Sequence, residues 1–155
     1  MTEEFDADLF DAAEFGDLDW IKQHFEDPSL EKTVKRTQLE YQDKNGNSLL
    51  TISTYYKHME IAFFLLSQKS QLEIKNKIRV TAEYKKVLKW ITYHLKTKNQ
   101  SFGSSDSIQL IHFYNLVFKQ LWEMGWRGND LTVEEQLPDQ HMPDFFIKWR
   151  KELGK

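Results

Sequence analysis

Apolar residues near the start of the chain recur at the spacing of helices that are buried on one side. One apolar set lies within residues 9–13 and a second within residues 18–25. Between the two sets, Gly16 suits a helix C-terminus and Asp17 can cap the helix that follows. The pattern therefore predicts a helix–turn–helix pair over residues 5–25.

The same two-helix pattern returns over residues 43–66, where a turn precedes the first helix. Lys57-His58 marks the reversal, and it lies 41 residues after Gly16-Asp17. A unit of this kind cannot bury its apolar face alone and needs neighbours in a stack. We therefore predict a repeat protein in which residues 43–66 form the best-formed unit.

A short sequence echo supports the repeat interpretation. Gln38-Leu39-Glu40 returns 33 residues later as Gln71-Leu72-Glu73, and Ser48 is followed at the same distance by Thr81. The longer offset of the helix pairs then indicates an insertion around residues 27–36.

These residues resemble the ankyrin repeat, which has a D-x-x-G turn, then T-P-L-H, then A-A-x-x-G-H-x-E-I-V-x-x-L-L. The positions that fit the pattern here are Asp43, Gly46, Ser48, Leu50, His58, Glu60, Ile61, Leu65 and Leu66. The sequence departs from it by Leu49 for Pro, Thr51 for His, Ser53-Thr54 for the paired Ala and Lys57 for Gly. The resemblance covers about residues 5–95, with one clear repeat at 43–75 and degenerate repeats on both sides.

The second half of the chain is helical by pattern but does not continue the repeat. Tyr84, Val87, Leu88, Ile91 and Leu95 form one apolar stripe, which predicts a continuous helix over 81–96. After a polar loop, Ser105 or Asp106 can cap a helix that runs to about Met124. A capping box at 132–135 and a final helix from Pro143-Asp144 follow.

Together these elements predict an all-α fold. We expect a short ankyrin-like helical solenoid of two to three units with β-hairpin turns, closed by a C-terminal helical cap. The stack would comprise residues 1–98 and the cap residues 99–155, packed on each other as a single compact domain. A cap fits because repeat arrays need their open end covered.

Composition narrows the class of protein. Eleven Phe, six Tyr and five Trp suit a core built on large rings, and six Gly with three Pro disfavour an all-β sandwich. The absence of cysteine excludes disulfides and thiolate metal sites. Neither a signal-peptide pattern nor an apolar run of membrane-helix length is present. We therefore expect a cytoplasmic protein that does not insert into membranes.

Catalytic and cofactor signatures are missing from the sequence. The five His have no metal-site spacing, and no nucleophile elbow, Walker pattern or G-x-G-x-x-G occurs. We therefore predict no enzyme activity, no metal and no cofactor. One enzyme alternative stays open, namely a site assembled from His112, His141 and tail carboxylates in a deep polar pocket between stack and tail.

The charge distribution is uneven although the net charge is only −3. Residues 1–20 carry eight acidic side chains and no basic one, whereas residues 75–98 carry eight basic side chains against Glu83 alone. A nucleic-acid-associated protein that uses residues 75–98 is therefore the alternative function. The overall pI of about 6.0 and the lack of any nucleic-acid-binding signature argue against it.

The resemblance implies that the protein binds another protein through the concave repeat surface. We expect a non-catalytic adaptor or stoichiometric inhibitor, with an immunity- or antitoxin-like role among the inhibitor options. Carried over position by position, the partner-binding residues are Glu14, Phe15, Lys44, Asn45, Asn47, Tyr55, Tyr56, Lys85 and Lys89. The adjacent tyrosines fit a contact surface, although packing of both against the tail is the competing interpretation.

Overall fold

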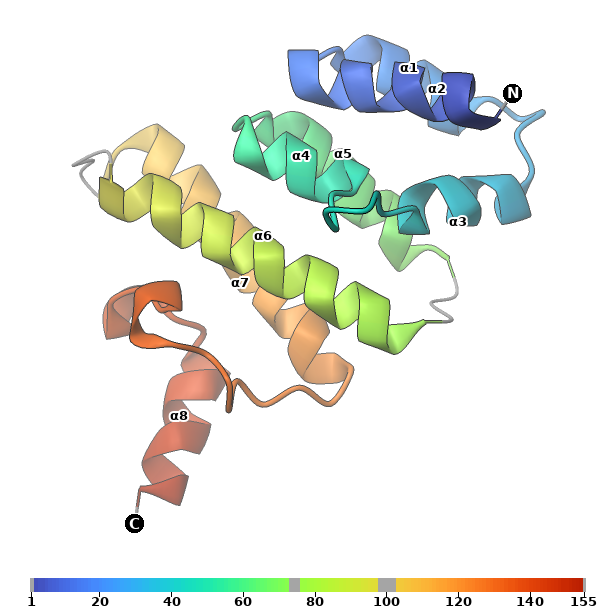
Figure 1. The fold of residues 1–155 in the computed structure, drawn as a ribbon. Helices are drawn as coiled ribbons and strands as arrows, with labels where there is room; N and C mark the ends of the chain where they lie inside the picture. The colour runs from blue at the N-terminus through green and yellow to red at the C-terminus, as the bar shows by residue number, and fades with distance from the viewer. Residues whose placement is uncertain (1, 73–75, 98–102, 155) are drawn as a thin grey trace. The chain divides into compact units, whose positions relative to one another are not determined.

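The computed structural model describes residues 2–72, 76–97 and 103–154, and it is all-helical with no strand among them (Figure 1). The helices are α1 (Thr2–Phe15), α2 (Leu18–Glu26), α3 (Lys32–Glu40), α4 (Leu49–Tyr55), α5 (Met59–Ser70), α6 (Lys77–Thr97), α7 (Ser105–Glu123) and α8 (Asp144–Leu153). Two 3₁₀ turns, η1 (Val133–Glu135) and η2 (Asp139–His141), lie between α7 and α8. The all-α prediction is confirmed at this level.

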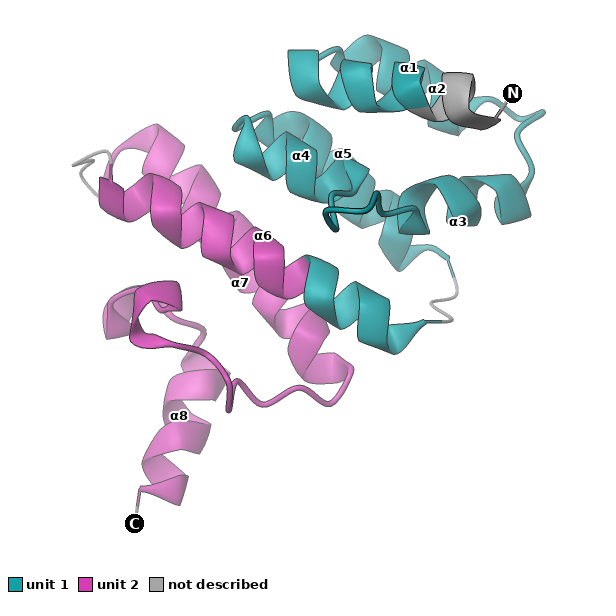
Figure 2. Cartoon of the chain, in the orientation of Figure 1, with its two compact units in different colours: residues 1–83 teal, residues 84–155 magenta. Residues whose placement is uncertain are grey.

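The chain divides into two compact units, residues 1–83 (unit 1) and 84–155 (unit 2), as Figure 2 shows. The boundary falls inside α6, whereas the sequence placed the end of the repeat stack at residue 98.

Unit 1 contains two helical pairs, α1 with α2 and α4 with α5, and the pairs pack side by side. α1 contacts α4, and α2 contacts α5. The buried side chains of these four helices include Leu9, Ala13, Ile21, Phe25, Leu49, Leu50, Ile61, Ala62 and Leu65. Both predicted helical pairs are therefore present, and each covers the apolar face of the other.

The reversals within the two pairs have the same backbone geometry. Gly16 has φ +83° and Lys57 has φ +63°, and the residue after each has φ −85°. The amide of Asp17 donates to Ala12 O at 2.9 Å, and the amide of His58 donates to Ser53 O at 2.8 Å. The predicted offset of 41 residues is therefore confirmed in hydrogen bonds as well as in sequence.

The turn before α4 is held by its own side chains. The carboxylate of Asp43 accepts the amides of Asn45 at 2.8 Å and Asn47 at 2.9 Å, and Gly46 adopts φ +78°. Helix α4 then starts with a reciprocal capping box between Ser48 and Thr51. The predicted turn is present, but the β-hairpin form is not confirmed, because the described residues around it form no strand.

Ser53 and Thr54 of α4 stand where the ankyrin pattern has two Ala residues. Their hydroxyls can be buried because each bonds to a carbonyl of its own helix. Ser53 donates to Leu49 O at 2.7 Å and Thr54 donates to Leu50 O at 2.9 Å. Both side chains are fully buried, so the hydroxyls are satisfied without a second helix.

Helix α3 lies where the sequence interpretation placed an insertion, and that interpretation missed a helix. Gln38 bonds to the His24 ring at 2.8 Å, which ties α3 to α2. The two copies of the Gln-Leu-Glu echo also differ in structure. Residues 38–40 end α3, whereas Gln71 caps α5 and residue 73 lies outside the described residues. The two described positions of the echo, Gln38/Gln71 and Leu39/Leu72, are therefore not structurally equivalent.

A buried ion pair joins three helices of unit 1. Lys69 Nζ on α5 lies 3.0 Å from Glu83 Oε1 on α6 and donates to Leu39 O on α3 at 3.1 Å. The two charged side chains are only 3% and 1% exposed. The second oxygen, Glu83 Oε2, is buried without a hydrogen-bond partner. Loss of either partner would therefore leave the other charge buried without its counter-ion.

Unit 2 contains the rest of α6, then α7, the segment with η1 and η2, and α8. The predicted continuous helix over 81–96 is confirmed, and every member of its apolar stripe is buried. Helix α7 is also confirmed, but Ser104 caps it rather than Ser105 or Asp106, by accepting the Ser107 amide at 3.2 Å. The polar loop before it lies mostly outside the described residues.

Aromatic rings hold α8 against α7. Phe118 contacts Phe146 and Trp122 contacts Phe145 edge-to-face, with ring centroids 5.0 and 5.1 Å apart. The segment before α8 is tied to α7 by Tyr114, whose hydroxyl donates to Glu135 O at 2.8 Å. The predicted capping box at 132–135 and the predicted helix from Asp144 are both confirmed.

Candidate partner-binding surface

The open side of α4 is aromatic. Of its residues and the one that follows, only Ile52, Tyr55 and Tyr56 are not buried. Their spacing of three and four places them on one face of the helix. Tyr55 is 44% exposed and Tyr56 46%, and their rings meet edge-to-face with centroids 4.9 Å apart. Within unit 1 both side chains therefore lie at the surface, as expected for a contact face.

Phe15 and Glu14 lie at the same end of the α1–α4 pair as the tyrosines. The His58 ring, two residues after Tyr56, bonds through Nε2 to Glu14 O at 2.8 Å. Phe15 is 74% exposed at the last position of α1. The His58 ring therefore reaches from the second helical pair to the first.

The three turn residues among the predicted partner-binding positions, Lys44, Asn45 and Asn47, take two different roles. Lys44 and Asn45 are exposed, whereas Asn47 is half-buried and bonds to the Asp43 carboxylate through its backbone amide at 2.9 Å and its side-chain amide at 3.3 Å. Asn47 therefore stabilises the turn, and Lys44 and Asn45 are its exposed positions.

Lys85 and Lys89 belong to unit 2, so the structure does not place them beside the aromatic face of unit 1. Lys85 forms an ion pair with Asp130, and this contact with the ammonium group lowers the pKa of the Asp130 carboxyl below its usual value. Lys89 is exposed. The ion pair occupies the Lys85 side chain within its own unit.

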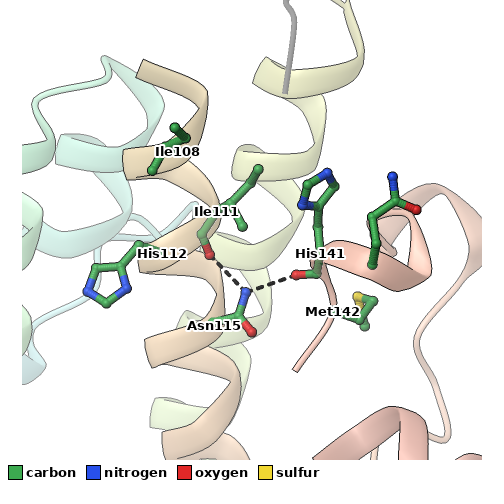
Figure 3. A pocket seen from close by; sticks show the side chains of 7 residues that line it. Ile108, Ile111, His112, Asn115, His141 and Met142 are labelled. Atoms are coloured by element: carbon green, nitrogen blue, oxygen red, sulfur yellow. Dashed lines mark hydrogen bonds between the residues drawn. The ribbon is translucent and has the colours of Figure 1, made fainter. Parts of the chain in front are cut away.

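Unit 2 also contains a cavity of about 500 Å³, shown in Figure 3. It is lined by Ile108, Ile111, His112, Asn115, Gln140, His141 and Met142. The Asn115 amide donates to Ile111 O at 2.9 Å and to His141 O at 3.0 Å, which ties α7 to the η2 segment. Sequence reasoning named the two histidines but missed Asn115, which carried no motif.

Both histidines of the enzyme alternative, His112 and His141, line the cavity. Figure 3 shows the His112 ring pointing away from the His141 ring, and no described Asp or Glu lines the space. The cavity lies wholly within unit 2, not between stack and tail. In the described part of the chain, no three His, Asp or Glu side chains are arranged to hold a metal ion. None of the helices described there is long and apolar enough to cross a bilayer.

The chain was compared with family models, curated proteins and solved structures. No match was found in any of the three comparisons.

Proposed function

We propose that this protein is a non-catalytic, ankyrin-like protein-binding module of the cytoplasm, acting as an adaptor or stoichiometric inhibitor. The observation that carries the proposal is the pair of exposed tyrosines on the open face of α4. Tyrosine supplies contact area and a hydrogen-bonding hydroxyl at low entropic cost, which is why it is enriched where proteins bind each other. The geometry shared by the two helical pairs supports a repeat architecture of this kind.

The alternative nucleic-acid function has less support. Lys85 is paired with Asp130, and Lys96 donates to the carbonyls of Val133 and Glu134. These cations of the basic segment 75–98 are therefore occupied within unit 2. Absence of salt-dependent retention on DNA or heparin at low ionic strength would exclude that function.

Affinity capture from the native host tests the proposal. The full chain, the variant Tyr55→Ala/Tyr56→Ala and the control Tyr93→Ala/Val133→Ala serve as bait. The control removes two exposed side chains from unit 2. We expect the wild type and the control to retain a common partner that the tyrosine variant loses, with all three melting at nearly the same temperature. Retention of that partner by the folded tyrosine variant would overturn the proposal.

A further inference from the structure

The open faces of α1 and α4 differ from the rest of the chain in charge. Neither helix contains a Lys, Arg or His. On α1, Asp8, Asp11 and Phe15 are exposed and follow one stripe of the helix. With the 41-residue offset of the two helical pairs, Asp11 and Phe15 of α1 correspond to Ile52 and Tyr56 of α4, and the two helices pack against each other. We therefore take the exposed stripe of α1 to continue the face that carries the two tyrosines.

The neighbouring segments do not reverse this charge. Lys44 precedes α4 and Lys57 follows it. Two exposed carboxylates beside the reversals, Asp17 and Glu60, equal these two lysines in number. The half-buried Glu14 adds a further carboxylate at the end of α1. Lys77 and Arg79 at the start of α6 are exposed as well, but they lie near the turn before α4, where Gln42 bonds to Arg79 O. At the end of the face that carries Phe15 and the tyrosines, carboxylates therefore predominate.

We propose that the partner of this face is a protein segment that carries arginine or lysine together with apolar side chains. This inference rests on the proposed function and names the chemistry of the partner. A guanidinium can stack on a tyrosine ring and bond to a carboxylate with two parallel hydrogen bonds. Apolar side chains of the same segment fit against Phe15 and Ile52. An acidic partner or a nucleic acid would meet like charge here.

A defined peptide tests this chemistry. The full chain is titrated with a helical peptide of arginine, leucine and alanine, and with a second peptide that has glutamate in place of arginine. Amide chemical shifts locate the contact and calorimetry gives the affinity. We expect binding of the arginine peptide alone, with shifts confined to residues 8–15 and 52–58. No binding, shifts elsewhere, or tighter binding of the glutamate peptide would overturn the inference.

Two double variants test whether the peptide is bound by the carboxylates of α1 or only attracted by the net charge of the protein. Asp8→Asn/Asp11→Asn and Glu26→Gln/Glu31→Gln each remove two exposed carboxylates, and the second pair belongs to the end of α2 and the start of α3 instead of α1. We expect the first variant to lower the affinity for the arginine peptide about fivefold, as expected for the loss of exposed ion pairs. We expect the second variant to change this affinity little. Equal losses would overturn the inference, because bulk attraction would then explain the binding.

The same variants distinguish this inference from the proposed function. If capture of the partner requires Tyr55 and Tyr56 but is unchanged in Asp8→Asn/Asp11→Asn, the proposed function is retained. The inference that the partner is basic is then overturned. Capture that survives loss of both tyrosines would remove the proposed function itself.

Discussion

The imidazole of His58 fills the space that a side chain at Gly16 would need. A Cβ built on Gly16 would lie 2.7 Å from the His58 ring, and Gly16 itself adopts φ +83°. The close approach follows from the bond between His58 and Glu14 O, which brings the ring over the reversal of the first helical pair. The two helical pairs are therefore in close contact at this point. Position 16 requires glycine both because the His58 ring leaves no room for a Cβ and because φ is positive.

Gly16→Ala is expected to destabilise the protein by about 2 kcal/mol, because left-handed strain and a displaced His58 hydrogen bond add together. Gly125→Ala is the control, since it has φ +103° but open space around its Cβ. Chemical denaturation should show the smaller loss for Gly125→Ala. Equal losses would mean that the His58 ring moves aside without cost.

Lys57→Gly is expected to stabilise the protein by about 1 kcal/mol, because Lys57 has φ +63° and glycine reaches that region without strain. Lys22→Gly, at an exposed position inside α2, should lower stability by a similar amount. A lower melting temperature for Lys57→Gly would show that the Lys57 side chain contributes more than its backbone conformation costs.

Lys69→Ala is expected to cost about 3–5 kcal/mol, because it leaves the Glu83 carboxylate buried and unpaired. The double variant Lys69→Met/Glu83→Met should recover most of that loss, since it removes both charges and keeps apolar volume. A double-mutant cycle by urea denaturation measures the coupling. A cost below about 1 kcal/mol for Lys69→Ala would show that water reaches the carboxylate.

Tyr114 makes stability sensitive to alkaline pH. Its pKa is raised above the usual value of 10.0, first by burial and then by the nearby Glu135 charge. The folded state therefore keeps a proton that the unfolded state releases, so stability is complete below about pH 10 and falls as the pH rises further. Tyr114→Phe should flatten this decline and cost about 1 kcal/mol at neutral pH for the lost bond to Glu135 O. An unchanged alkaline slope would contradict the assignment to Tyr114.

Deletion of residues 143–155 is expected to cause aggregation, because it uncovers Phe118 and Trp122, which pack against the rings of α8. Truncation after Arg150 is the control, because residues 151–154 are exposed. Light scattering and circular dichroism report the outcome. A soluble, folded chain ending at residue 142 would show that α8 does not protect this surface.

The long amphipathic helices could be predicted from sequence because their apolar residues recur at one period. The stripe of α6 is an example, and so are the paired reversals at Gly16 and Lys57. Helix α3 could not be predicted in this way. It has few apolar residues, and Glu31 at its start makes no side-chain capping bond. Its contacts come from other helices, through His24 and Lys69.

The candidate surface was predictable in part. The exposed tyrosines follow from their register in the resemblance, and the structure gives both side chains open area. Lys85 could not be assigned from its position alone, because its partner Asp130 lies 45 residues later in the chain. The burial of Lys69 could not be predicted either, since a lysine in a helical pattern ordinarily indicates an exposed face.

Helix α6 passes without interruption from unit 1 into unit 2, and the boundary falls between Glu83 and Tyr84 (Figure 2). Both residues are buried, and no linker separates them. Neither half can therefore be grafted onto another protein, or exchanged by recombination at this boundary, without cutting through a helical turn.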